Sequence, residues 1–264
     1  MNYVEPIAFI FGLVIGSFLN VCIYRVPRGI SIVRPPSACP VCKTSIRPWE
    51  NIPLLSYVLL RGKCRGCGEL ISLRYPLVEL LNGLFYLWAM RYFGPGWRLL
   101  FLCAFLSSMV VITFIDLDFQ IIPDVITLPG ALVGVLGASL FLPDPFSLFA
   151  AGASSPLPLV GLINSLVGLA LGGGLFYLIA VLSRGGMGGG DIKMMAMVGA
   201  FMGWKAVLLT TFVGSLTGSV VGIFLMVLKG KSRKTKIPFG PFLALGAIIT
   251  LFFGGRILRW YFHL

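Results

Sequence analysis

The sequence predicts an all-α polytopic membrane protein, and three observations support this fold class. Of the 264 residues, 58% are hydrophobic and 11% are charged, whereas a soluble domain carries about 25% charged residues. The mean hydropathy is +0.96. Several apolar stretches also approach the length of about 20 residues that a helix needs to cross a bilayer. We therefore expect most of the chain to lie in lipid as helices.

Eight apolar stretches are candidate membrane helices. The sixth is short, and Gly203-Trp204-Lys205 predicts a tight turn between it and the seventh, so seven helices are an alternative. The eight stretches are residues 6–24, 76–93, 99–115, 125–142, 158–183, 192–204, 206–228 and 241–260.

The charge distribution predicts the orientation of these helices. No Lys or Arg precedes the first stretch, and Arg25 follows it, which is the reverse of a cleaved secretory signal. We expect this stretch to remain as a helix with its N-terminus outside. Nine of the 21 Lys and Arg residues then fall on the cytoplasmic side between Arg25 and Arg74, and five between Lys229 and Lys236, as the positive-inside rule requires. Contact with an anionic lipid bilayer accounts for the net charge of +12, and no nucleic acid partner is needed.

We expect four parts along the chain. Residues 1–24 form the first membrane helix, 25–75 a polar cytoplasmic loop, 76–98 the second helix with an external turn, and 99–264 a six-helix domain. Within the last part, the segment 143–157 is rich in Pro, Ser and Ala, which is typical of a surface connector. No internal repeat is visible, and this argues against the inverted repeats of many transporters.

Four cysteines in the loop 25–75 form two CxxC pairs, each with the spacing of a zinc knuckle. Disulfides or free thiols are the alternatives, and a reducing cytoplasm disfavours disulfides. A loop of this size has too little apolar surface to fold unaided, so a closed zinc site would supply the missing free energy. We therefore predict a structural zinc ion bound by Cys39, Cys42, Cys64 and Cys67.

Two aspartates are the main catalytic candidates. Asp116 ends the apolar stretch 99–115, and Asp191 follows the glycine-rich run 185–190 and opens the stretch 192–204. Ionisable residues at membrane depth are costly and therefore point to function. We expect both to converge on the cytoplasmic face. Two adjacent carboxylates share one proton, so one can take a proton from water while the other polarises a carbonyl. This is the chemistry of peptide hydrolysis without a covalent intermediate.

Other interpretations of the acids remain open. Asp191 could cap a helix N-terminus, and Asp124 beside Pro123 is typical of a first-turn or cap acid. If the helix continues past Asp116, Asp118 points about 200° away and cannot complete the pair. The role of Glu79 is left open. A proton-coupled transporter with the same aspartates, and a zinc-stabilised scaffold without catalysis, are the alternative functions.

Five sequence blocks resemble one known family, the type IV prepilin peptidases, which are GxGD membrane aspartyl proteases. The resemblance runs from about residue 10 to 245. The blocks are IDLDFQIIPD around Asp116, Gly188-Gly189-Gly190-Asp191 followed by IKMMAMVGAFMGW, GSFLNVCIYRVPRG from Gly16, ENIPLLSYVLLRGKCRGCG from Glu50, and ISLRYPLVELLNG from Ile71.

This resemblance implies a bifunctional bacterial inner-membrane enzyme. Such an enzyme removes the basic leader of type IV prepilins or type II secretion pseudopilins on the cytoplasmic side, and then methylates the new N-terminal residue with S-adenosylmethionine. By motif position, Asp116 and Asp191 are the catalytic pair and the four loop cysteines bind the metal. Gly62 belongs to the loop associated with methyl transfer. The oligomeric state is not indicated.

The sequence lacks the usual motif of a nucleotide-binding domain for S-adenosylmethionine. The chain has no GxGxxG unit, and the loop is too short for an ordinary doubly wound domain. We therefore expect the cofactor to bind between the loop and the helices, where Glu50, Asn51, Arg74 and Glu79 supply polar groups.

Overall fold

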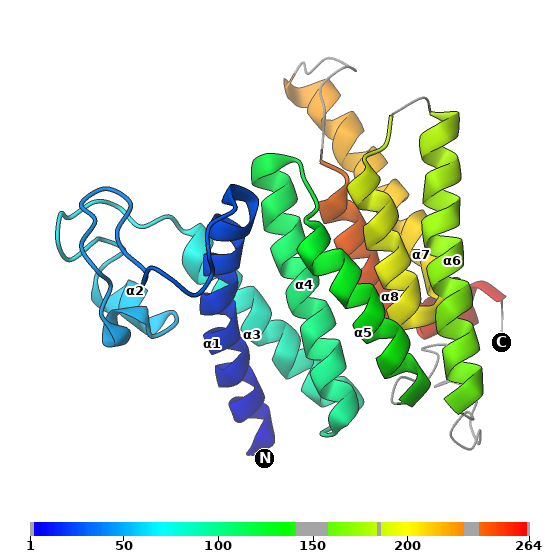
Figure 1. The fold of residues 1–264 in the computed structure, drawn as a ribbon, viewed down its shortest axis with the longest axis horizontal. Helices are drawn as coiled ribbons and strands as arrows, with labels where there is room; N and C mark the ends of the chain where they lie inside the picture. Colours follow the sequence, from blue (N-terminus) through cyan, green and yellow to red (C-terminus); the bar gives the residue numbers. More distant parts are fainter. Residues whose placement is uncertain (1–2, 141–157, 184–185, 230–237, 263–264) are drawn as a thin grey trace. The chain divides into compact units, whose positions relative to one another are not determined.

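The computed structural model describes residues 3–140, 158–183, 186–229 and 238–262. Within these ranges every regular element is a helix, apart from two isolated β-bridges, so the all-α prediction is confirmed (Figure 1). The expected connector 143–157 and most of the basic segment after Lys229 lie outside the described residues. The chain divides into two compact units, Met1–Val111 and Ile112–Leu264.

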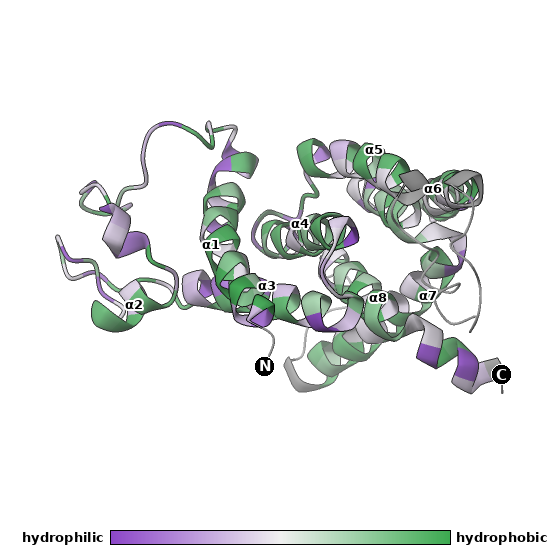
Figure 2. Cartoon of the chain, turned by 90° about the horizontal axis from the view of Figure 1, so that it is seen from below, coloured by the Kyte–Doolittle hydropathy of each residue, from purple (hydrophilic) through white to green (hydrophobic). Residues whose placement is uncertain are grey.

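The first unit contains a pair of long helices and a polar loop between them. The helices are α1 (Val4–Arg25) and α3 (Arg74–Phe93), which pack against each other. The loop contains three short helices, η1 (Val26–Arg28), η2 (Pro48–Asn51) and α2 (Leu55–Leu59). Figure 2 shows the contrast between the apolar helices and the more polar loop.

Glycines bring α1 and α3 into close contact. A Cβ atom added to Gly12 would lie 2.8 Å from Gly83 Cα, and one added to Gly16 would lie 2.7 Å from Glu79 Cα. Small residues four apart let two membrane helices approach closely. This contact places the second turn of α3 directly against the middle of α1.

A buried hydrogen-bonded network joins α1, α3 and α4 (Trp97–Phe119). Asn82 donates to the Gly12 carbonyl at 2.7 Å, and Ser107 donates to Asn82 Oδ1 at 2.9 Å. The hydroxyls of Tyr86 and Ser107 are 3.0 Å apart. Each polar group in this network has a partner inside the unit, as burial in an apolar setting requires.

The second unit is organised around α7 (Gly189–Lys229). Helices α5 (Asp124–Leu140), α6 (Pro158–Leu182) and α8 (Gly240–Phe262) all pack against α7. The N-terminal half of α7 is densely buried, and Met194, Met195 and Met197 have no exposed surface.

The sequence predicts a tight turn at Gly203-Trp204-Lys205, and the structure has a break in helical geometry at Gly203. Helix α7 contains one non-helical residue, Gly203, with φ 80° and ψ 175°. A Cβ at this position would lie 2.7 Å from the Asn164 amide of α6, so both the backbone conformation and the packing require glycine. The stretches 192–204 and 206–228 thus correspond to the two limbs of α7.

Helix α4 ends later than the sequence predicts. The sequence predicts a helix over 99–115 with Asp116 at its end, but α4 continues to Phe119. Helical hydrogen bonding persists past the carboxylate, because the Gln120 N–H still bonds the Asp116 carbonyl at 2.9 Å. The chain then turns at Gln120, whose φ is 54°. Asp116 therefore lies inside the last turn of the helix rather than beyond it.

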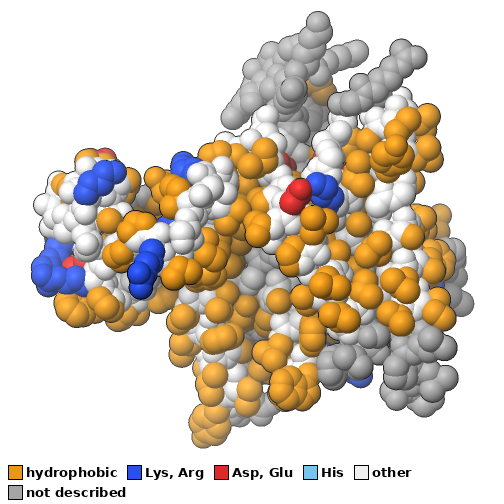
Figure 3. Space-filling model, in the orientation of Figure 1, with side chains coloured by type: hydrophobic (Ala, Val, Ile, Leu, Met, Phe, Trp, Pro, Cys, Tyr) orange, Lys and Arg blue, Asp and Glu red, His pale blue; other side chains and the backbone are white. Residues whose placement is uncertain are grey.

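Five of the described helices are long and apolar enough to cross a membrane: Val4–Arg28, Trp97–Phe119, Gly161–Leu182, Gly189–Val227 and Gly240–Tyr261. Many large apolar side chains on them are exposed, including Phe11, Ile163 and Phe224, and Figure 3 shows an extensive apolar surface. Such helix sides suit contact with lipid. The number of eight membrane helices stays a prediction.

The crossing of α6 and α7 yields a stability prediction. A Cβ atom added to Gly168 would collide with the Gly199 carbonyl, whereas Gly174 on the same helix has open space around it. Gly168→Ala should destabilise the protein by about 1–3 kcal/mol through overpacking. Gly174→Ala is the matched control and should be neutral or slightly stabilising. The free energy of unfolding in detergent measures both, and equal effects would contradict this packing.

Candidate active site and metal centre

Asp116 is held by the N-terminus of another helix. Its side chain is 5% exposed, and its Oδ2 atom accepts the Gly240 backbone N–H at 2.9 Å. Gly240 begins α8, and the free N–H groups of a helix N-terminus favour a negative charge. The contact joins residues 124 positions apart, so it depends on the complete second unit.

Asp191 lies in the first turn of α7 and is 8% exposed. Its Oδ2 atom accepts the Gly188 backbone N–H at 3.3 Å. This contact satisfies one N–H ahead of the helix, as an N-terminal acid often does. The other oxygen, Oδ1, is buried and has no hydrogen-bond partner among the described residues. A helix-capping role alone would not bury that second oxygen.

The two aspartates share one small region. They interact electrostatically with each other, and Ile122 packs between the glycines beside them. A Cβ atom on Gly190 would lie 2.7 Å from Ile122 Cβ, and one on Gly240 would lie 3.3 Å from Ile122 Cδ1 and 2.7 Å from Asp116 Oδ2. Glycine is needed at both positions, because a Cβ would overlap Ile122 at position 190 and the Asp116 carboxylate at position 240. Their role as a catalytic pair on the cytoplasmic face stays a prediction.

The neighbouring acids have different environments. Asp118 is exposed while Asp116 is buried, as the helical geometry predicts. Asp124 lies in the first turn of α5 and pairs with Lys193 at 2.6 Å, and both side chains are largely exposed. The interpretation of Asp124 as a first-turn acid is confirmed. Asp116 and Asp191 are thus the buried acids of this region.

The loop cysteines lie on two similar turns in the first unit. In each turn the first cysteine N–H bonds a carbonyl five residues on, Cys39 to Thr44 at 3.0 Å and Cys64 to Glu69 at 2.7 Å. The residue after each CxxC is left-handed, with φ 60° at Lys43 and 74° at Gly68. Both CxxC pairs therefore adopt the tight turn that a zinc knuckle requires.

The four sulfur atoms form a compact cluster. All lie within 4.8 Å of one another, and the Cys39–Cys67 and Cys42–Cys64 Sγ pairs are each 3.9 Å apart. Tetrahedral zinc with Zn–S bonds of about 2.3 Å separates its sulfurs by about 3.8 Å. None of the cysteines is in a disulfide. The cluster fits a structural zinc ion with a closed shell.

The environment of Cys42 favours its thiolate. Hydrogen bonding to the side chain and backbone of Thr44 lowers the pKa of Cys42 to about 6. Backbone hydrogen bonds from Cys67 and Gly66 also lower the pKa of Cys64. The thiolate is the form that binds metals. Each of the two turns therefore has one cysteine whose surroundings favour the metal-binding form.

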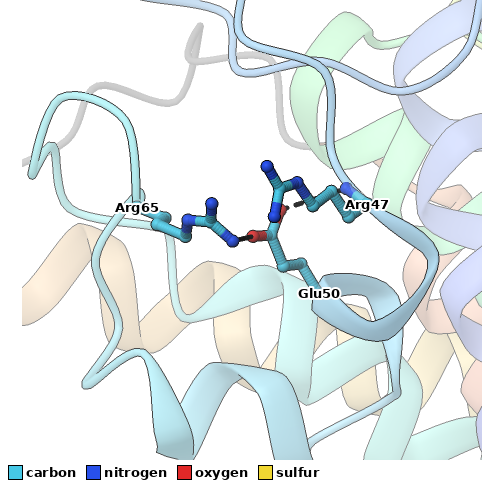
Figure 4. A network of polar contacts seen from close by, with 3 residues as sticks. All are labelled: Arg47, Glu50 and Arg65. Atoms are coloured by element: carbon cyan, nitrogen blue, oxygen red, sulfur yellow. Dashed lines mark hydrogen bonds and ion pairs between the residues drawn. The ribbon is translucent and has the colours of Figure 1, made fainter.

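Glu50 connects the two halves of the loop. Its Oε1 accepts Arg65 Nη1 at 2.8 Å, and its Oε2 accepts the Arg47 backbone N–H at 3.0 Å (Figure 4). The Arg47 N–H, assisted by the charge of Arg65, lowers the pKa of Glu50. Both oxygens are thus engaged within the loop, and a role for Glu50 in cofactor binding stays a prediction.

Each of the remaining predicted cofactor residues has its own contacts. Gly62 has φ 67°, and a Cβ there would lie 2.9 Å from the Tyr57 hydroxyl, so only glycine fits this turn. Asn51 Oδ1 accepts the Ser17 hydroxyl at 3.3 Å. Arg74 starts α3, with its guanidinium 5.8 Å from the Tyr75 ring centre. Their role in binding a cofactor stays a prediction.

Three residues with polar contacts near these sites were not singled out from the sequence. Gly240 contacts Asp116 from a distant helix, and only its place between Phe239 and Pro241 marks a helix start. Ser17 and Asn20 are polar residues inside an apolar stretch. Polar groups at membrane depth are a recognisable signal of function, so these two could have been found from sequence.

Together the fold and the site define an all-α membrane protein with a buried aspartate pair and a four-cysteine cluster. Two family models match it: Bacterial Peptidase A24 N-terminal domain over residues 10–93, and Type IV leader peptidase family over residues 103–223. No solved structure matches the chain.

Curated relatives extend this likeness to nearly the whole chain. The chain is 37% identical to the prepilin leader peptidase/N-methyltransferase of Aeromonas hydrophila, over 97% of its own length and 92% of that protein. It is 36% identical to the protein of the same name in Pseudomonas aeruginosa, over 97% of its own length and 94% of that protein. The chain belongs to the type IV leader peptidase family.

Proposed function

We propose that the chain is a membrane-embedded aspartyl endopeptidase that removes the basic leader of type IV prepilins or type II secretion pseudopilins, and then N-methylates the new N-terminal residue. The observation that carries this proposal is the convergence of two buried aspartates at a junction lined by glycines in a chain of this family. The names of the relatives support the peptidase over a transporter.

The aspartates have complementary surroundings for hydrolysis. Gly240 donates to one oxygen of Asp116 and Gly188 to one oxygen of Asp191, while Asp191 Oδ1 remains available as an acceptor. One carboxylate takes a proton from the attacking water, and the protonated one polarises the scissile carbonyl. Glycine at positions 190 and 240 lets Ile122 and the Asp116 carboxylate approach the backbone closely, which holds the pair in place.

The two expected cofactors have different support. The compact sulfur cluster supports a structural zinc ion held by Cys39, Cys42, Cys64 and Cys67. The methyltransferase part of the relatives' name supports S-adenosylmethionine as the methyl donor. When bound, it would supply an electrophilic methyl group. The junction of the loop with α1 and α3 has a buried acceptor, Asn20 Oδ1, that has no partner among the described residues, and it fits a donor group of such a ligand.

The topology that we propose follows the charge bias. The N-terminus lies outside, and the loop 25–75, Asp116 and Asp191 face the cytoplasm of a bacterial inner membrane. In this arrangement the reduced thiols meet a reducing compartment, and the leader is cleaved on the side where prepilins are synthesised.

Reconstitution tests the proposal. The purified full chain in detergent, given a prepilin and S-adenosylmethionine, should release the leader and add one methyl group to the new N-terminus, as intact-mass spectrometry can read. A chain with Asn at both 116 and 191 is the control and should leave the prepilin intact. A wild-type chain that leaves prepilins and pseudopilins uncut would overturn the peptidase, and pH-driven uptake into vesicles would favour a transporter.

A further inference from the structure

A group of buried polar side chains lies outside both sites, between α1 and α3. Ser17, Asn20 and Glu79 are 8%, 4% and 8% exposed. All three belong to the first unit, and none is a cysteine ligand or a neighbour of the aspartate pair. Buried polar groups of this kind are costly in an apolar setting.

The contact of the two helices gathers these side chains. Gly16 lies against the Glu79 backbone, so Ser17 and Asn20, which follow Gly16 within a turn, face α3. Asn20 Nδ2 donates to the Tyr75 carbonyl at 3.1 Å, one turn before Glu79. The group is therefore built by rigid helices rather than by a surface loop.

Asn20 leaves one acceptor without a partner. Its Oδ1 atom is buried and has no hydrogen bond among the described residues. The amide orientation is fixed, because Nδ2 faces two carbonyl oxygens, of Gly16 at 3.4 Å and of Tyr75 at 3.1 Å. Turning the amide over would place Oδ1 against both carbonyls. The unsatisfied atom is thus an acceptor and needs a donor.

Glu79 is a buried carboxylate to which no cationic side chain of the described residues is bound. Its Oε2 accepts the Leu54 backbone N–H at 2.9 Å. Across the described ranges, no Lys or Arg forms an ion pair with Glu79. A buried carboxylate is normally paired or bound to a cation. Glu79 therefore lacks the positive partner that its burial calls for.

The backbone opposite Glu79 is strained. Leu54 has φ 60° and ψ −46°, and the Leu55 N–H bonds the Pro53 carbonyl at 2.6 Å. This is a γ-turn of the positive-φ form, which is rare for a residue with a side chain. Strain of this kind concentrates where a site must be held in shape. Here the turn aims the Leu54 N–H at Glu79.

Acceptors outnumber donors in this group. The Ser17 hydroxyl donates its one proton to Asn51 Oδ1 at 3.3 Å, so it supplies no donor to Asn20 Oδ1. Asn51 is exposed and marks the side on which the group opens toward the loop. A ligand with several N–H donors and a positive charge would satisfy the Glu79 carboxylate, Asn20 Oδ1 and Asn51 Oδ1 together.

We propose that Ser17, Asn20, Asn51 and Glu79 form a binding site for a primary ammonium group used in methyl transfer. The inference rests on the proposed function. Two ammonium groups take part in that reaction: the new α-amino terminus of the cleaved pilin, and the amino-acid end of S-adenosylmethionine. Both present three N–H donors and one positive charge, and the group between α1 and α3 recognises that shared chemistry.

Binding measurements on the purified full chain test this site. Glu79→Gln keeps the shape of the side chain and removes its charge. The probes are S-adenosylmethionine, a short apolar peptide with a free α-amine, and the same peptide N-acetylated. Glu79→Gln should weaken the binding of the free-amine peptide or of S-adenosylmethionine on the order of 10- to 100-fold. The probe whose binding is weakened identifies the source of the ammonium group.

Glu5→Gln is the matched control. Glu5, in the first turn of α1, pairs with Arg91, in the last turn of α3, at 2.7 Å. The Glu5→Gln change therefore removes the same charge from the opposite end of the same helix pair. It should leave the binding of both probes within about twofold. Asn51→Ala, at an exposed position, is a second test that does not depend on a buried substitution, and it should weaken the same probe.

The outcomes separate this site from the proposed function. Leader cleavage by Glu79→Gln reports that the chain is folded. The ammonium site is wrong, while the peptidase stands, if Glu79→Gln and Asn51→Ala bind the free-amine peptide and S-adenosylmethionine as the wild type does. It is also wrong if the wild type binds the free-amine and acetylated peptides equally and Glu79→Gln leaves the binding of S-adenosylmethionine unchanged. If wild type fails to cleave prepilin, the proposed function fails, and the binding results still decide the ammonium site.

Discussion

Asp116→Asn and Asp191→Asn should each reduce leader cleavage by about 10²- to 10⁴-fold or more, because each removes a proton donor and acceptor from the reacting pair. Asparagine keeps the size of the side chain and can still accept the N–H of Gly240 or Gly188. The loss should therefore be chemical rather than structural. Initial rates of prepilin cleavage by purified chains, matched by their unfolding temperatures, provide the measurement.

Asp118→Asn is the internal control for this prediction. Asp118 lies two residues along α4 from Asp116 but is exposed, so cleavage should stay close to wild type. Methylation of a pre-cleaved pilin should survive in both single mutants of the pair, since the loop and the α1–α3 contact belong to the other unit. Near-normal cleavage in either mutant of the pair would exclude a shared catalytic role.

Gly240 allows a graded version of the same test. A Cβ atom there would lie 2.7 Å from Asp116 Oδ2, so Gly240→Ala must displace the carboxylate without removing it. Misplacing a catalytic group in this way should reduce cleavage by about 10- to 100-fold. Gly189→Ala is the matched control, because the space beside Gly189 is open, and its rate should remain near that of wild type.

The parts of this structure that sequence could predict are those fixed by local pattern. Apolar length predicts α1, α6 and α8, the glycine at 203 predicts the break in α7, and CxxC spacing predicts the cysteine cluster. Each follows from hydropathy, backbone freedom or ligand spacing within a short segment.

Other features depend on contacts between distant segments. Helix α4 continues past Asp116 to Phe119, and the chain leaves the helix at Gln120, which has a positive φ. A carboxylate alone does not end a helix. The Gly240 contact with Asp116 requires α8 to pack beside α4's last turn. The unsatisfied acceptor of Asn20 emerges only when both partners of its amide are known.

Metal removal is the second change with a large expected effect. Four sulfurs hold the two turns of the loop together, while Glu50 adds only an ion pair with an Arg65 side chain that is 51% exposed, and such pairs contribute little. Structural zinc contributes about 10–16 kcal/mol to small zinc-binding peptides. Without zinc the segment between Arg34 and Leu70 should unfold.

Cys42→Ser should accordingly eliminate bound zinc, make the loop sensitive to limited proteolysis and abolish methyl transfer. Leader cleavage should fall far less, because every hydrogen bond described for Asp116 and Asp191 comes from the second unit. Cys22→Ala is the matched control, since this thiol lies in α1 outside the cluster, and zinc content by mass spectrometry should stay at one ion per chain. A metal-free wild type with a protease-resistant loop would show that the cysteines hold the loop without zinc. Loss of cleavage in parallel with methylation would instead show that the aspartate pair needs the folded loop.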